Sequence, residues 1–188
     1  MPLLPFLAPD DPFPPGSEAL DYPSGLLAVS EDLGPERLLA AYRRGIFPWF
    51  EEPQPVLWWT PDPRLVLFPE EFHCARSLRR TLRRERFRLT VDSCFRTVME
   101  ACAAPRPGQD GTWISPRLVA AYGALHDAGH AHSIEAWDRQ DRLVGGLYGV
   151  CIGGAFFGES MFSRAPDASK VALAGLTHLL GAGGGRVI

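Results

Sequence analysis

Apolar residues recur every three to four positions in five segments of the chain, which is the spacing of an amphipathic helix. The sharpest example carries Phe95, Val98, Met99 and Cys102 at positions i, i+3, i+4 and i+7. Proline favours the first helical turn and serine caps free backbone N–H groups, so Ser115 and a following proline mark one helix start. The pattern predicts helices over 35–44, 73–84, 95–102, 116–128 and 167–180.

Other segments alternate apolar and polar residues at every second position, the period of a half-buried strand. In the first of them the apolar side is expected to be Phe87, Leu89 and Val91. Two longer runs are typical of a hairpin joined at Gly153 and Gly154. The pattern predicts strands over 86–91, 132–138, 142–152 and 155–162, with a last one in 181–188. Helices on a largely antiparallel sheet indicate an α/β (α+β) fold.

Prolines dominate residues 1–25 and interrupt the aromatic-rich run that follows. Because proline fixes φ and removes a backbone donor, we expect this part to be extended, to lie over a surface and to hold only short strands. A second group of prolines, Pro61 and Pro63, precedes an arginine-rich helix. We therefore predict an N-terminal lobe over 1–62 and a larger domain over 63–188.

Positive charge gathers on one side of the helix 73–84, although the formal net charge of the chain is −3 and Lys170 is the only lysine. Leu78 and Leu82 form its expected apolar side. A solvated helix usually mixes both signs of charge, because like charges repel at this spacing. We favour phosphate binding over a merely solvated face. The basic side consists of Arg76, Arg79, Arg80, Arg83 and Arg84.

Four tryptophans, at positions 49, 58, 59 and 113, fall in loop-like segments, where large aromatic rings can stack on nucleobases. For Trp58 and Trp59 we favour a structural role, as plugs between the two lobes. Glu159 ends a strand among apolar residues, and two interpretations stay open for it. It is either a partly buried carboxylate that holds a cationic amine or a ribose hydroxyl, or an ordinary paired surface glutamate.

Three other motifs predict no site of their own. His126, His130 and His132 have a spacing that resembles zinc ligands, but no acidic third ligand is close in the sequence, so structural histidines are favoured. The string GESMF lacks the last glycine of a serine hydrolase's nucleophile elbow. The glycines of 181–185 lack the following Lys-Ser/Thr of a phosphate-binding loop.

Cysteine use and the N-terminus indicate the compartment. The four cysteines form no C-x-x-C pair, which indicates free thiols in a reducing environment. The N-terminus lacks the basic and apolar regions of a signal peptide, and no apolar run approaches the ~20 residues of a membrane helix. We expect a soluble cytoplasmic protein.

Several long strings, in order across 20–188, resemble the leucyl/phenylalanyl-tRNA–protein transferase family. The strings are GIFPWF (45–50), LWWTPDPR (57–64), GTWIS (111–115), HDAGHAHSIE (126–135), LVGGLYGV (143–150), FFGESMFSR (156–164) and DASK (167–170). The resemblance implies an acetyltransferase-like (GNAT-like) domain with a small N-terminal lobe. It implies transfer of Leu, Phe or, less readily, Met from aminoacyl-tRNA to proteins that begin with Arg or Lys, which marks them for degradation by the N-end rule. It implies no metal, ATP or other cofactor, because the ester bond already carries the activation.

The resemblance also implies roles for individual residues. Trp49 and Trp113 would flank the 3′-terminal adenosine, and Glu159 would help hold the aminoacyl-adenosine end. The five arginines of 73–84 match the family's basic cluster for the tRNA acceptor stem. An apolar pocket for the Leu or Phe side chain would be lined by Leu147, Phe156, Met161, Leu173, Leu176 and Ile188.

Two features depart from the family pattern. Ser30 and Glu31 stand where the family usually has Gly-Gly, which bears on a local turn because glycine permits φ > 0 at low cost. The family continues after the position of Ile188 with Asp-Cys-Gln, so its catalytic Asp and Gln and its final strands are not among these 188 residues. No catalytic residue is therefore assigned, and we expect this chain to be strongly impaired as a transferase.

Two other functions stay open as alternatives. A noncatalytic module would capture tRNA ends with the arginine helix and the tryptophans, and would bind tRNA without forming a product. A GNAT-fold acyl-coenzyme A transferase would need a glycine-rich pyrophosphate loop that opens a helix, and neither 181–185 nor Gly145-Gly146 opens one.

Overall fold

The computed structural model describes residues 4–105 and 111–188. The chain folds into two compact units. One unit consists of Met1–Leu65 with Pro105–Tyr122, and the other of Val66–Ala104 with Gly123–Ile188. Helix α4, Pro116–Asp127, begins in the first unit and ends in the second. None of the helices in the described ranges has both the length and the apolar character of a membrane span.

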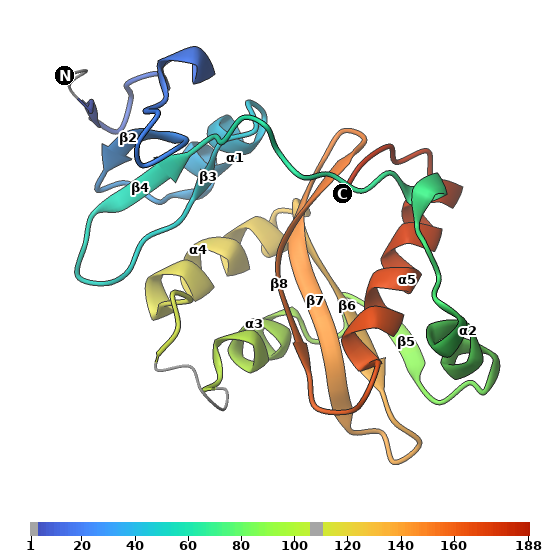
Figure 1. Ribbon diagram of the computed structural model, residues 1–188. Coiled ribbons are helices and arrows are strands. Elements are labelled where there is room, and N and C mark those ends of the chain that lie inside the picture. Colours follow the sequence, from blue (N-terminus) through green and yellow to red (C-terminus); the bar gives the residue numbers. More distant parts are fainter. Residues whose placement is uncertain (1–3, 106–110) are drawn as a thin grey trace. The chain divides into compact units, whose positions relative to one another are not determined.

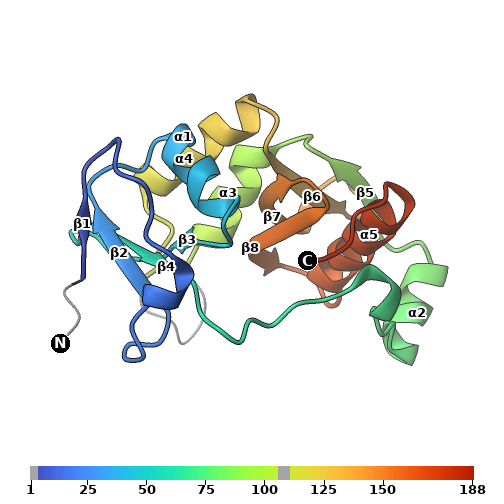
Figure 2. The same cartoon turned by 90° about the horizontal axis from the view of Figure 1, so that it is seen from above.

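The first unit contains a four-stranded sheet in the order β1-β2-β4-β3 (Figures 1 and 2). The strands are β1 (Phe6–Leu7), β2 (Leu26–Ser30), β3 (Phe47–Pro48) and β4 (Val56–Trp59), and the helices are α1 (Pro35–Tyr42) and η1 (Gly16–Glu18). β1 runs parallel to β2, and the other pairs are antiparallel. The expected extended course of the N-terminal prolines is therefore confirmed in large part, with one short strand and one short helical turn.

The second unit is built on an antiparallel sheet in the order β5-β6-β7-β8. Its strands are β5 (Arg88–Val91), β6 (Ala131–Trp137), β7 (Leu143–Ile152) and β8 (Ala155–Ser163). Its helices are α2 (Arg76–Arg83), α3 (Phe95–Ala103), α5 (Ala168–Ala182) and the short η2 (Pro69–Glu71). These elements confirm the mixed α/β class and the antiparallel sheet, together with the β7–β8 hairpin that turns at Gly153, where φ is 60°.

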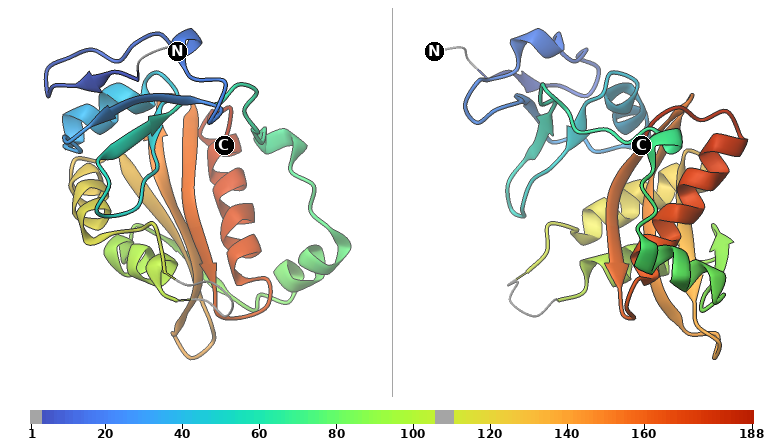
Figure 3. Two further views of the ribbon diagram at one scale, coloured as in Figure 1. Left: turned by 60° about the vertical axis from the view of Figure 1, so that its left-hand side comes forward. Right: turned by 45° about the vertical axis from the view of Figure 1, so that its right-hand side comes forward.

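α3 and α5 cover opposite faces of this sheet (Figures 1 and 3). Neighbouring residues of β7 point to opposite faces. Tyr148 meets the α3 residue Phe95 edge-on at 5.8 Å between ring centroids. Leu147 instead packs in a cluster with Leu176 of α5. The glycines of β7 allow a helix to approach closely: a Cβ on Gly145 would lie 2.5 Å from Ala168 Cβ of α5.

The structure corrects three expectations for individual elements. The C-terminal strand begins later than expected: α5 continues through Ala182, and β pairing starts at the parallel bridge of Val187 with Ala155. Val91 is 49% exposed instead of facing the core, because it is the last residue of β5, which lies at the edge of the sheet. Leu82 is 37% exposed, and Thr81 is buried in its place.

Candidate functional site

The exposed face of α2 carries five arginines, as the sequence predicted. Arg76, Arg79, Arg80, Arg83 and the C-capping Arg84 are all exposed, while Leu78 and Thr81 are buried. At about 100° per residue the five guanidinium groups fall within an arc of about 140°, opposite the buried pair. In residues 4–105 and 111–188, no carboxylate forms an ion pair with any of the five. This face is therefore a concentration of uncompensated positive charge that suits an anion.

A side-chain hydrogen bond ties α2 to the start of α5. Thr81 Oγ1 donates to Asp167 Oδ2 at 2.9 Å, and Lys170 Nζ lies 3.6 Å from Asp167 Oδ1. Asp167 stands at the N-cap of α5 in the left-handed region, with φ of 70°, and makes no side-chain cap to its own helix. Aspartate is a preferred N-cap residue. Here its carboxylate holds a neighbouring helix instead.

Trp49 is the exposed aromatic ring of the 45–50 motif, with half of its surface accessible. Trp59 supports it: Trp59 Nε1 donates to the Trp49 carbonyl oxygen at 2.7 Å, and the two ring centroids are 5.6 Å apart. Trp58 is fully buried and donates to Ser30 Oγ at 2.8 Å. Trp58 is thus a core residue of its own unit, while the expected role of Trp58 and Trp59 as plugs between the two lobes stays a prediction.

Trp113 belongs to the same compact unit as Trp49 and is half-buried. It precedes the capped start of α4, where Ser115 N–H donates to the Trp113 carbonyl oxygen at 3.0 Å. Ser115 Oγ in turn accepts from the N–H of Leu118 at 3.3 Å, which confirms Ser115 as the N-cap. Capping fixes where the helix begins and, with it, the backbone that carries Trp113.

Glu159 is half-buried and occupies an irregularity in the ladder between β7 and β8. Tyr148 pairs with Ser160 and Gly149 with Gly158, so Glu159 is the extra residue between them. Such bulges re-aim a side chain and are frequent beside active sites. Burial, and then the charge of Glu159, raises the pKa of the Tyr148 phenol well above its ordinary value. The charge of the Glu159 carboxylate is therefore felt by Tyr148, on the face of the sheet that α3 covers.

Five of the six residues expected to line an apolar pocket come together on the α5 side of the sheet. Leu147, Phe156 and Leu176 are buried in one cluster, and Leu173 and Ile188 pack against it. The sixth behaves differently: Met161 is 40% exposed and lies outside that cluster, although it pairs with Leu147 in the ladder.

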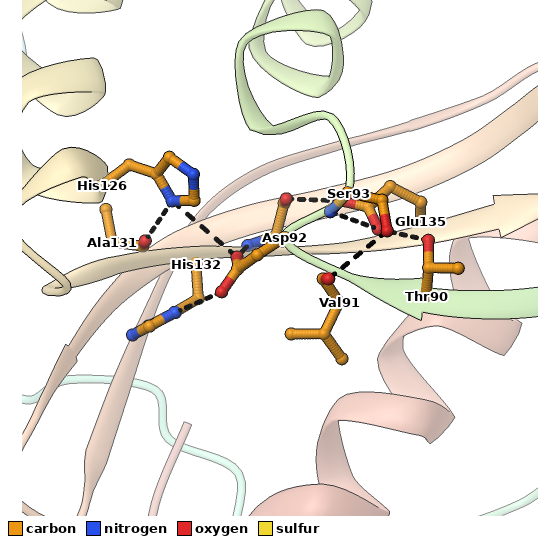
Figure 4. Close-up of polar contacts among 9 residues, drawn as sticks. Thr90, Val91, Asp92, Ser93, His126, Ala131, His132 and Glu135 are labelled. Carbon is orange, nitrogen blue, oxygen red and sulfur yellow. Dashed lines mark hydrogen bonds and ion pairs between the residues drawn. The ribbon is translucent and has the colours of Figure 1, made fainter.

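The histidine motif meets an aspartate that its sequence pattern did not reveal (Figure 4). Asp92, in the turn between β5 and α3, accepts from His132 Nδ1 at 2.7 Å and lies 3.9 Å from His126 Nδ1. His126 also contacts the Ala131 carbonyl oxygen and stacks on Phe95, with centroids 4.3 Å apart. No group of three or more metal-ligating side chains assembles among the described residues. The histidines therefore do have an acidic partner, Asp92, but it is distant in sequence and belongs to the turn between β5 and α3.

Glu135 is a second acidic residue, after Asp92, whose polar contacts the sequence did not predict. It is fully buried and accepts from Thr90 Oγ1 at 2.5 Å (Figure 4). It also accepts from Ser133 Oγ at 2.5 Å. Trp137 Nε1 donates to Thr90 Oγ1 at 2.8 Å, which extends the network along β6. The i, i+2 spacing of Ser133 and Glu135, which puts both on one strand face, was the signal for this contact.

Comparison with known proteins identifies close relatives. A family model described as leucyl/phenylalanyl-tRNA protein transferase matches residues 66–188, and one for the N-terminal domain of that transferase matches residues 31–62. The leucyl/phenylalanyl-tRNA–protein transferase of Nitrosomonas eutropha is 58% identical over 171 residues, which cover 91% of this chain and 73% of the relative. The enzyme of that name from Thiobacillus denitrificans is 62% identical over 168 residues, 89% of this chain and 73% of the relative.

A third relative of the same name, from Chromobacterium violaceum, is 54% identical over 186 residues, which cover 99% of this chain and 79% of the relative. Among solved structures, that of L-PGS from Bacillus licheniformis superposes with a TM-score of 0.44 and 11% identity, over 85% of this chain and 49% of that chain. This structural likeness is too low to assign a fold family.

Proposed function

The chain belongs to the leucyl/phenylalanyl-tRNA protein transferase family, and from that membership we infer that it is an aminoacyltransferase that moves an amino acid from tRNA onto a protein N-terminus. The observation that carries this function is the match of the family model to 66–188, with identities of 54–62% to the enzymes of that name. We propose Leu, Phe and, less readily, Met as the transferred residues, and proteins that begin with Arg or Lys as acceptors in the cytoplasm.

The chemistry asks the protein mainly to bind and align two substrates. The acceptor's α-amino group attacks the ester carbonyl in its neutral form, and its ordinary pKa of about 7.7–8.0 leaves roughly a tenth or more of it neutral near pH 7. Alignment of two reactants supplies much of the acceleration of such a step. We propose that residues 63–188 form a GNAT-like catalytic domain for this alignment and residues 1–62 a smaller lobe.

The proposed substrate contacts follow the residues described above. The arginine face of α2 binds phosphates of the tRNA acceptor stem, which its uncompensated charge supports. Trp49 and Trp113 flank the terminal adenosine, and Glu159 holds the aminoacyl-adenosine end. The cluster around Leu147, together with Met161, receives the apolar side chain. One methylene is worth only ~1–3 kcal/mol in such a pocket, which suits acceptance of Leu, Phe and Met.

The test is transfer of radiolabelled leucine from Leu-tRNA to a model protein with an N-terminal arginine. A matched acceptor that begins with alanine is the control for acceptor selectivity. Label in the arginine protein alone supports the proposed function. Because the family's Asp-Cys-Gln is not among these 188 residues, the same assay is run on a form extended through those three residues. Binding of Leu-tRNA with no labelled product in either form refutes the proposed function and favours the noncatalytic tRNA-binding module.

A further inference from the structure

The segment that carries Trp49 is an edge element with little backbone support of its own. β3 has two residues and lies at the edge of the first unit's sheet. It pairs with β4 through Phe47 with Trp59 and Pro48 with Trp58, and the Trp49 N–H donates to the Leu57 carbonyl oxygen at 2.9 Å. Edge strands this short are held by few ladder hydrogen bonds. A ring that must present one face to a ligand needs further support there.

Two side chains from 57–64 supply that support, one at each end of 45–50. At one end, Trp59 Nε1 donates to the Trp49 carbonyl oxygen at 2.7 Å, and the Trp59 ring meets the Trp49 ring at a tilt of 59°. At the other, Arg64 Nη1 donates to the Gly45 carbonyl oxygen at 2.5 Å, and its guanidinium carbon lies 4.8 Å from the centre of the Phe47 ring. Gly45 itself has φ of 71°.

We propose that Trp59 and Arg64 are positioning residues that fix the Trp49 indole for nucleobase stacking. The proposal rests on the proposed function, in which Trp49 flanks the terminal adenosine. Stacking of a base on an aromatic ring stabilises binding only after the cost of ordering the ring is subtracted, so a ring fixed in advance binds more tightly. The motif LWWTPDPR then contributes one core residue, Trp58, and two supports for the motif GIFPWF.

The decisive variant is Trp59→Phe, which keeps an aromatic ring and removes the Nε1–H donor. Trp137→Phe is the matched control, because Trp137 Nε1 also makes a single 2.8 Å hydrogen bond, to Thr90, in the other unit. The ligand is an amide-linked phenylalanyl-adenosine, and binding is measured by calorimetry. Loss of one neutral hydrogen bond predicts an affinity about fivefold lower for Trp59→Phe and unchanged affinity for Trp137→Phe.

A second readout reports the ring directly. The chain has five tryptophans, so fluorotryptophan labelling gives five fluorine resonances, which single Trp→Phe variants assign. In Trp59→Phe the Trp49 resonance is expected to shift and broaden while the Trp58 resonance stays in place. Arg64→Lys retains a charged donor but loses the planar fork. It should therefore perturb the Trp49 resonance less than Arg64→Ala does.

An unchanged Trp49 resonance together with wild-type affinity in Trp59→Phe overturns the proposal. Trp49→Ala tests the premise that Trp49 flanks the adenosine: wild-type affinity in that variant removes Trp49 from the adenosine site and overturns the positioning role with it. The transferase function keeps its separate test in the leucine-transfer assay. If Trp49→Ala lowers the affinity and Trp59→Phe leaves it unchanged, the positioning role alone is refuted. Thermal unfolding of each variant separates lost positioning from lost folding.

Discussion

Neutralising part of the α2 arginine face should change how tRNA binding depends on salt. Arg76 and Arg83 lie two helical turns apart and within about 20° of each other on the helix surface. Both are exposed, and glutamine is a comparably good helix former, so Arg76→Gln with Arg83→Gln removes charge without breaking α2. If four of the five arginines neutralise phosphates at once, log K falls with log [salt] at a slope of roughly −3.6.

That slope means a roughly 150-fold loss of affinity between about 50 and 200 mM salt. With two contacts removed the slope becomes roughly −1.8 and the loss roughly 12-fold, so wild type and variant converge at high salt. Fluorescence anisotropy with labelled tRNA at four or five salt concentrations measures both slopes. The exposed Arg139, in the turn between β6 and β7, is the control, and Arg139→Gln should keep the wild-type slope. An unchanged slope in the double variant would show that this face is only solvated.

Three further changes test the packing that carries the site. Thr81→Val removes the hydrogen bond to Asp167, so α2 amides should exchange with solvent faster and tRNA should bind more weakly, by about fivefold for one such bond. Gly149→Ala places a Cβ 2.1 Å from a backbone oxygen and should cost at least about 3 kcal/mol in urea unfolding, whereas Gly158→Ala, with nothing within 4 Å, should cost about 0.5 kcal/mol or less. The folded-state pKa of Tyr148 is raised, so the stabilisation it gives is present below its unfolded pKa of about 10 and is lost as pH rises above that value. Urea unfolding at several pH values should show that Tyr148→Phe removes this loss.

Local chemistry was enough to predict the elements whose cause lies within a few residues. The period of Phe95, Val98, Met99 and Cys102 gives a helix with all four buried. Ser115 caps α4 as its position before a proline implied. In such cases the residue types and their spacing decide the structure, whatever packs against them.

Contacts between residues far apart in sequence were not predictable in the same way. The histidine motif lacked an acidic partner in sequence, yet Asp92 reaches it from another connection because β5 lies beside β6. Leu82 had the better apolar pattern, yet Thr81 is buried, because the Asp167 carboxylate at the start of α5 accepts its hydroxyl hydrogen bond. Each of these outcomes depends on a partner whose position only the folded chain determines.

Residue type suggests a role for exposed residues more readily than for the residues that support them. An exposed tryptophan such as Trp49 offers a ring face on which a nucleobase can stack, so its residue type suggests a site. A supporting group such as Trp59 resembles any half-buried aromatic residue, because its function lies in the atom it holds. Asp167 makes the same point: aspartate before a helix predicts a cap, and only the Thr81 hydroxyl shows that its carboxylate fixes the arginine helix instead. Residues proposed to touch substrate can thus be suggested by residue type and exposure, and residues proposed to position them are found only by following each donor to its acceptor.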